Sequence, residues 1–233
     1  MNKKNYSYIG ISFIILLFGI YALPKLVNSI SNNKVVKKSK RLDKISSEKK
    51  KSGLYKFDKK APTFSFTNQN NATISDKDFA NKVYVAEFFF TNCPTICPIM
   101  NKNMVKIQDI YKDNPDFGIV SFSIDPERDS PEVLKKYAEE KGATMKNWHF
   151  LNGKIETIYE LANSGFKISA GENTEAEGGF EHSGLFALID KNGFIRSRTV
   201  TQNGFENPIM YYDGLDIKQV NWLKEDIALL LQE

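Results

Sequence analysis

The sequence predicts an α/β fold in which a mixed central sheet carries helices on both faces. Three observations lead to this prediction. Segments with strand character alternate with segments of helical periodicity over residues 61–233, and the alternation closes on an antiparallel hairpin. Both cysteines of the chain lie where the first central strand is followed by a helix. Alternating strands and helices favour a sheet with parallel strands, to which the hairpin adds antiparallel ones.

The elements around the cysteines follow from local residue patterns. Residues 64–67 (FSFT) alternate apolar and polar side chains, as a short strand does. Residues 83–90 (VYVAEFFF) are rich in aromatic and β-branched residues, which is typical of a buried central strand. After the cysteine segment 91–98 (TNCPTICP), apolar residues recur near helical spacing over residues 99–111, and Pro98 suits a first helical turn.

The alternation continues through the middle of the chain. Residues 118–124 (GIVSFSI) predict a second strand. Residues 130–141 predict a helix, because its first residue is a capping serine and the next is a proline, and Gly142 ends it. A short strand is expected at residues 149–151 and a further helix at residues 155–162.

The last elements complete a thioredoxin-like architecture. Residues 185–190 (LFALID) and 194–200 predict a hairpin with an Asn-Gly turn between them. Residues 216–231 predict an amphipathic terminal helix. Residues 165–184 show no regular pattern and contain several glycines, and a loop of that length inside a compact domain is usually functional or mobile. The cysteines then occupy the turn between strand and helix at which thioredoxin-like proteins place their thiols.

The N-terminal region predicts an anchored protein. Residues 1–7 form a short tail, and the apolar residues 8–27 predict a transmembrane helix that acts as an uncleaved signal anchor, since a span needs about 20 apolar residues. A cleaved signal peptide is the alternative. Residues 28–60 predict a Lys-rich stalk before the thioredoxin-like domain at 61–233. We expect that domain to be extracytoplasmic, at the periplasmic face of the inner membrane in a Gram-negative cell.

The charge distribution excludes a nucleic-acid-binding domain. The whole chain has a formal charge of +4, but residues 1–60 hold 15 Lys/Arg and 3 Asp/Glu. The remaining 17 Lys/Arg and 25 Asp/Glu give residues 61–233 a formal charge of −8. An acidic domain cannot neutralise phosphates, so we expect no nucleic-acid partner.

The two cysteines can support redox or metal chemistry. Cys93 and Cys97 are four positions apart and share a face on a helical turn. The start of the following helix favours thiolates, which are both nucleophiles and metal ligands. Thioredoxin-type oxidoreductases use C-x-x-C, whereas the wider spacing here suits a metal and can still close a disulfide. A purely structural disulfide over so small a loop would add little stability.

A third ligand has to come from elsewhere in the chain. The sequence contains two histidines, of which His149 reads as a partly buried structural residue and His182 precedes a predicted strand whose end lies near the thiols. From the residues alone, ligand and ordinary residue are equally good interpretations of His182. Two thiolates with one imidazole suit Cu(I) or zinc, and an added oxygen ligand admits Cu(II). Met100 and Met104 could assist, although core packing explains them better.

Three segments together resemble the Sco/SenC family of copper-binding cytochrome c oxidase assembly proteins. They are FFFTNCPTICPIM at 88–100, VSFSIDPERDSPEVLKKYAEEKG at 120–142 and EHSGLFALIDKNGFI at 181–195. The resemblance covers residues 61–231, and it is specific because all three segments occur in order. It implies a membrane-anchored, thioredoxin-like domain whose metal ligands are Cys93, Cys97 and His182. It also implies that Asp125 supports the site from outside, supplies an oxygen ligand or contacts a partner.

Two functions are compatible with this resemblance. The first is a metallochaperone that delivers copper to the dinuclear copper site of cytochrome c oxidase subunit II or a similar cuproprotein. The second is a thiol-disulfide oxidoreductase in which Cys93 and Cys97 are catalytic and reduce the cysteines of the apo-subunit or of another extracytoplasmic target. Either function requires reduced thiols in a compartment that can oxidise them, so a thiol reductant protein is an expected partner.

Overall fold

The computed structural model describes residues 12, 16–18, 20–21, 53–202 and 204–233. The chain divides into two units, Met1–Glu48 and Lys49–Glu233. Most of the predicted transmembrane segment and most of the predicted stalk therefore lie outside the described residues. Within the described parts of the chain, no helix combines the length and apolar character needed to cross a membrane.

The second unit consists of strands and helices in the predicted alternation. Its strands are β1 (Tyr55–Lys60), β2 (Ser65–Asn68), β3 (Thr73–Ser75), β4 (Val83–Phe89), β5 (Phe117–Ser123), β6 (Trp148–Asn152), β7 (Ala170–Glu172), β8 (Phe180–His182), β9 (Leu185–Ile189), β10 (Phe194–Ser197), β11 (Thr199–Gln202), β12 (Phe205–Pro208) and β13 (Tyr212–Asp213). Its helical segments are η1 (Asp76–Phe79), α3 (Cys97–Tyr111), α4 (Pro131–Glu140), α5 (Ile155–Tyr159), the π-helical η2 (Glu160–Phe166) and α6 (Ile217–Leu231).

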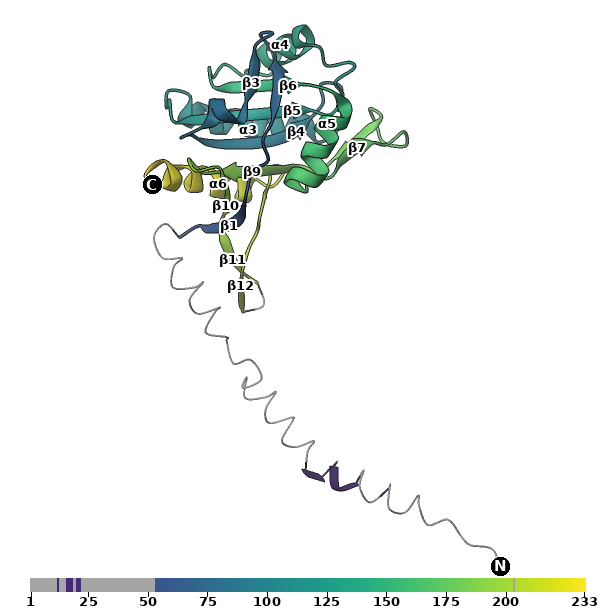
Figure 1. Cartoon of the computed structure of the whole chain (residues 1–233), viewed down its shortest axis with the longest axis vertical. Coiled ribbons are helices and arrows are strands. Elements are labelled where there is room, and N and C mark those ends of the chain that lie inside the picture. The colour runs from purple at the N-terminus through teal and green to yellow at the C-terminus, as the bar shows by residue number, and fades with distance from the viewer. Residues whose placement is uncertain (1–11, 13–15, 19, 22–52, 203) are drawn as a thin grey trace, which may run out of the picture. The chain divides into compact units, whose positions relative to one another are not determined.

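The central sheet is mixed, as the sequence predicted. Its strand order is β1-β10-β9-β4-β5-β6-β2-β3, and β13 also pairs with β9. The three strands β4, β5 and β6 are parallel, whereas β9 runs antiparallel to β4 and β2 runs antiparallel to β6. Figure 1 shows this order from β6 through β5, β4 and β9 to β10 and β1. The carboxyl ends of β4 and β5 and the start of β9 therefore lie at one edge of the sheet.

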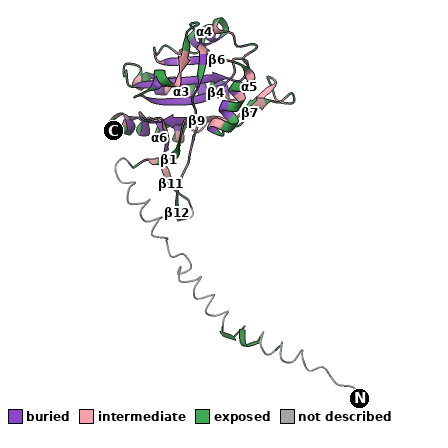
Figure 2. Cartoon of the chain, in the orientation of Figure 1, coloured by how far each residue is buried: buried purple, intermediate pink, exposed green. Residues whose placement is uncertain are grey.

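Helices cover both faces of the sheet. Successive parallel strands joined by right-handed crossovers place α3 and α4 on the same face. Adjacent side chains of β4 identify the two faces, because Phe89 packs against Tyr137 of α4 while Phe88 packs against Phe166 of η2. All seven residues of β4 are buried, and so are all seven of β5. Figure 2 shows these strands inside the unit, with the exposed residues on helices and outer hairpins.

Some elements differ from the sequence predictions. The folded part begins before residue 61, because β1 lies within the predicted stalk and pairs with β10. Residues 165–184 are not a bare loop but contain the β7–β8 hairpin. The strand predicted over 194–200 ends at Ser197, and β11 pairs with β12 in a separate two-stranded sheet. In Figure 1 that sheet projects beyond β1 and β10.

Candidate metal centre

The cysteines lie at the carboxyl end of β4, where the chain turns into α3. Cys97 is the first residue of α3, and the residue before it offers no side-chain cap to the helix. The sulfur of Cys93 takes that place, because the Cys97 amide donates a hydrogen bond to Cys93 Sγ over 3.4 Å. An amide donor and the positive end of a helix both favour a negative charge on this sulfur. Both cysteines are free thiols, with Cys93 9% exposed and Cys97 2% exposed.

His182 belongs to a segment that lies much later in the sequence than the cysteines. It is the last residue of β8 and precedes β9, which pairs antiparallel with β4 through Tyr84↔Ile189 and Ala86↔Ala187. This pairing brings the start of β9 beside the end of β4. The Nδ1 atom of His182 lies 3.2 Å from the Ser183 carbonyl oxygen, which can only accept, so Nδ1 carries the ring proton. The Nε2 lone pair is then free to bind a metal.

The three residues form one cluster of potential ligands. Cys97 Sγ lies 3.1 Å from His182 Nε2, and the ligand atoms of Cys93, Cys97 and His182 all lie within 4.8 Å of one another. Metal–sulfur bonds of about 2.3 Å and metal–nitrogen bonds of about 2.0–2.1 Å can span such separations with small adjustments. The structure thus brings together all three residues for which the sequence suggested metal binding.

The pKa values of the two thiols are shifted in opposite directions. A hydrogen bond from the Cys97 thiol holds the pKa of Cys93 well below its ordinary value, and the hydrogen bond from the Cys97 amide acts in the same direction. The pKa of Cys97 is raised, because its proton bonds to the Cys93 sulfur and because the side chain is buried. The pair therefore presents a Cys93 thiolate, the form required of a nucleophile or metal ligand, beside a Cys97 thiol.

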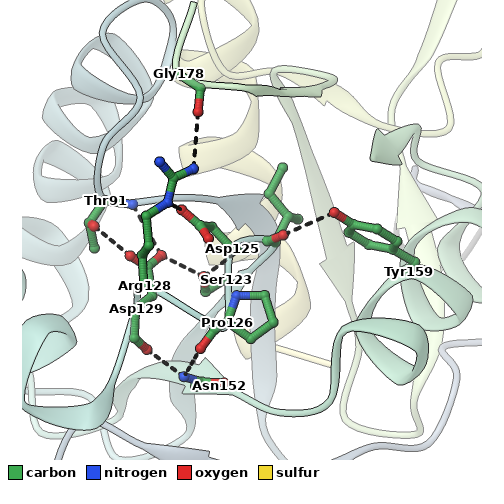
Figure 3. A network of polar contacts seen from close by, with 10 residues as sticks. Thr91, Ser123, Asp125, Pro126, Arg128, Asp129, Asn152, Tyr159 and Gly178 are labelled. Atoms are coloured by element: carbon green, nitrogen blue, oxygen red, sulfur yellow. Dashed lines mark hydrogen bonds and ion pairs between the residues drawn. The ribbon is translucent and has the colours of Figure 1, made fainter. Parts of the chain in front are cut away.

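Asp125 lies at the same edge of the sheet but belongs to an ion pair. It follows β5 and is 2% exposed, and its Oδ2 atom lies 2.5 Å from Arg128 Nε. Burial raises the pKa of Asp125, and the hydrogen bond from Arg128 opposes that rise. Among the described residues, the cluster of potential metal ligands consists of the two cysteines and His182, and Asp125 stands outside it. Figure 3 shows Asp125 directed at the Arg128 side chain.

Asp129 has a role that the sequence did not reveal. It does not cap the following helix, because Ser130 is the cap, as the sequence predicted, and accepts from the Val133 amide at 3.4 Å. Instead, Asp129 accepts hydrogen bonds from the Thr91 amide at 3.1 Å and from the Ser123 hydroxyl at 2.5 Å. It thereby ties the cysteine segment to the end of β5. The one available signal was that both segments directly follow neighbouring central strands.

The remaining candidates are structural, as the sequence favoured. His149 lies on β6, where its Nδ1 atom is 3.3 Å from Asn68 Nδ2 and its ring packs edge-on against Phe79. Met100 and Met104 are fully buried in the core. These three residues therefore contribute to packing rather than to the cluster.

Comparisons with known proteins agree with this site. The profile of the SCO1/SenC family matches residues 54–210. The chain is 37% identical over 165 residues to the SCO1 protein homolog of Bacillus subtilis, which covers 69% of this chain and 82% of that protein. It also superposes with a TM-score of 0.60 at 31% identity on the structure of BsSco, and the match covers 73% of this chain and 92% of that one. BsSco is described as a member of the Sco family of cytochrome c oxidase assembly proteins in which a disulfide switch was identified.

A more distant structure shares the fold. Bradyrhizobium japonicum ScoI, solved with copper bound, superposes with a TM-score of 0.56 at 21% identity, covering 75% of this chain and 99% of that one. The family match spans more than half of this sequence and includes both cysteines and His182. The chain therefore belongs to the SCO1/SenC family.

Proposed function

We propose that this protein binds copper through Cys93, Cys97 and His182 and delivers it during assembly of a cytochrome c oxidase. The observation that carries the proposal is the Cys-Cys-His cluster at the sheet edge, with all ligand atoms within 4.8 Å of one another. Relatives described as cytochrome c oxidase assembly proteins or solved with copper bound support it.

The chemistry of the cluster supports copper as the cargo. Two sulfurs and one imidazole are soft to borderline ligands, which suit Cu(I). A structural zinc site needs four closed ligands, whereas the cluster among the described residues has three. A site with three ligands can lose its metal by exchange, because each incoming thiolate can replace one outgoing ligand. The exchange transfers Cu(I) without oxidation or reduction.

The acceptor in this proposal is the dinuclear copper site of cytochrome c oxidase subunit II or a similar cuproprotein. Cys93 is the more exposed of the two cysteines, so it is the ligand that an incoming thiolate on the copper can displace first. We further propose that the apolar residues 8–27 anchor the protein in a membrane with its folded unit outside the cytoplasm.

Copper binding can be tested with the full-length protein and a competing Cu(I) chelator. Cys93→Ser, Cys97→Ser and His182→Ala should each weaken Cu(I) binding by about 100-fold or more, at least as much as loss of an outer partner of a ligand does. His149→Gln is the matched control, because it changes the other histidine of the chain, which lies on β6 outside the cluster. Unchanged affinity in both Cys93→Ser and His182→Ala would overturn the proposal.

A second function, thiol-disulfide exchange, is favoured by the unequal thiols. The Cys93 thiolate would attack a target disulfide and form a mixed disulfide, releasing one target thiolate. Cys97, after losing its proton, would then attack Cys93 Sγ, release the second target thiol and leave a Cys93–Cys97 disulfide. A thiol reductant protein has to supply two electrons and two protons to restore both thiols.

The two functions predict different effects of the histidine. His182→Ala should abolish tight copper binding but leave reduction of a disulfide peptide largely intact, whereas Cys93→Ser should remove both. If the reduced wild-type protein does not reduce the peptide, the exchange function is rejected while copper delivery stands.

A further inference from the structure

Arg128 connects the segment that follows β5 to the segment that carries His182. Its Nε atom lies 2.5 Å from Asp125 Oδ2, and its Nη2 atom donates to the Gly178 carbonyl oxygen at 3.1 Å. Gly178 belongs to the β7–β8 hairpin, four residues before His182. Figure 3 shows the guanidinium between Asp125 below it and Gly178 above it. The side chain spans 50 residues of sequence to reach the segment with the imidazole.

The segment that carries Arg128 is itself fixed to the rest of the site. Asn152 of β6 donates to the carbonyl oxygens of Pro126 and Asp129, at 3.0 and 2.5 Å. The Asp129 carboxylate binds the amide and hydroxyl of Thr91, two residues before Cys93. Residues 125–129 therefore hold the cysteine segment through Asp129 and the histidine segment through Arg128. Neither contact touches the ligand atoms themselves.

A series of aromatic contacts also links the Arg128 guanidinium to the His182 ring. Arg128 lies 5.1 Å from the ring centre of Phe180, Phe180 lies 5.4 Å from Phe90, and Phe90 meets His182 edge-on at 5.9 Å. Gly178 has a φ of +89°, and a Cβ at this position would come within 2.8 Å of the Phe90 ring. The close approach of Gly178 to Phe90 leaves its carbonyl within reach of Arg128.

We propose that Arg128 is a positioning residue that keeps His182 over the cysteine pair, with Asp125 orienting its guanidinium. The inference rests on the proposed function and assigns Asp125 a role through Arg128 rather than as an oxygen ligand. The Arg128 side chain is 50% exposed, so its removal should not unfold the domain. Without it, the β7–β8 hairpin loses its polar contact to residues 125–129, and His182 samples positions away from the sulfurs.

A double-mutant cycle in the full-length protein separates this role from a general charge effect. Cu(I) affinity is measured by chelator competition in wild type, Arg128→Ala, His182→Ala and the double variant. Arg128→Ala should weaken binding by about 10-fold, as loss of an outer support typically does. In the His182→Ala background the same change should have no further effect, because Arg128 acts through the imidazole. Lys136→Ala, which removes an exposed cation from α4, is the matched control for charge.

Two further measurements test the positioning role of Arg128 by more than the loss of copper affinity in one variant. Amide hydrogen exchange of the metal-free protein should speed up over residues 170–184 in Arg128→Ala and stay unchanged in Lys136→Ala. Arg128→Lys keeps the cation and should recover part of the affinity; it replaces Arg128→Ala in the cycle if the alanine variant does not fold.

The outcomes distinguish this inference from the proposed function. Equal losses from Arg128→Ala in the wild-type and His182→Ala backgrounds would overturn the positioning role. Unchanged affinity in Arg128→Ala, with a clear loss in His182→Ala, would also overturn it while leaving the copper site intact. If His182→Ala itself has no effect, it is the proposed copper site that fails.

Discussion

Glu87 provides a sharp test of the energetics of the core. It lies in the middle of β4 and is 3% exposed, and its Oε1 atom accepts a hydrogen bond from Ser121 Oγ at 2.7 Å. The Ser121 hydroxyl in turn accepts from the Trp148 indole at 3.0 Å. Burial raises the pKa of Glu87 to about 7, and the Ser121 hydrogen bond only partly opposes this rise. Glu87→Gln keeps the shape and the hydrogen-bond acceptor but removes the titration.

The sign of the effect follows from proton binding. Between the ordinary pKa of 4.5 and about 7, the folded state keeps a proton that the unfolded state has lost. The free energy of unfolding therefore falls as pH rises through this window and is level above it. Each pH unit inside the window costs about 1.4 kcal/mol, so the full penalty is about 3 kcal/mol. Most of it, about 2–3 kcal/mol, develops between pH values of about 5 and 8.5.

Urea unfolding of the full-length wild type and Glu87→Gln at these two pH values measures the penalty. The free energy of unfolding of the variant relative to wild type should increase by about 2–3 kcal/mol from the lower to the higher pH. Glu139→Gln, at an exposed position on α4, controls for the loss of one carboxylate. If the difference between wild type and Glu87→Gln is the same at both pH values, Glu87 does not carry a buried proton and the reasoning is refuted.

Three further predictions concern other parts of the fold. Burial lowers the pKa of His149, so the wild type should lose stability as pH falls below about 6.5. The free energy of unfolding of His149→Gln should depend less on pH over that range, which urea unfolding between about pH 7 and 5 will measure. Gly178→Ala, which combines a φ of +89° with a clash against Phe90, should weaken Cu(I) binding in a chelator competition, whereas Gly142→Ala, also at positive φ but with open space around it, should not. Met104→Ala removes a fully buried side chain and should lower the free energy of unfolding by about 2–5 kcal/mol, against less than about 1.5 kcal/mol for Met104→Leu.

Local patterns predicted the central elements of the fold correctly. The apolar run ending at Phe90 and the Ser-Pro pair at the start of α4 are local patterns of a few residues, so the sequence alone predicts β4 and α4. β1 was missed for a physical reason. It pairs with the sheet only through β10, and its lysines face solvent, so its composition is that of a solvated segment. The short β7–β8 and β11–β12 hairpins likewise have too few apolar residues to show a period.

The site was predictable only in part from the residues. The spacing of Cys93 and Cys97 identifies them as candidate ligands, but a ligand role for His182 follows only from the family resemblance. Its contact with Cys97 spans 85 residues and depends on the pairing of β9 with β4, which no local pattern encodes. The polar contacts of Arg128 with Gly178 and of Asp129 with Thr91 also join residues far apart in the sequence, separated by 50 and 38 positions. Such contacts leave no periodic signal in a single sequence.

The pairing of β9 with β4 also sets the order in which a newly made chain acquires its ligands. Cys93 and Cys97 are synthesised together and need only one helical turn to face a common point. His182 emerges 85 residues after Cys97, and it reaches the sulfurs once β9 has closed a long loop onto β4. Under the proposed function, a copper ion captured early is thus held by two sulfurs alone. In the same proposal, nitrogen ligation by His182, followed spectroscopically during refolding, reports the pairing of β9 with β4.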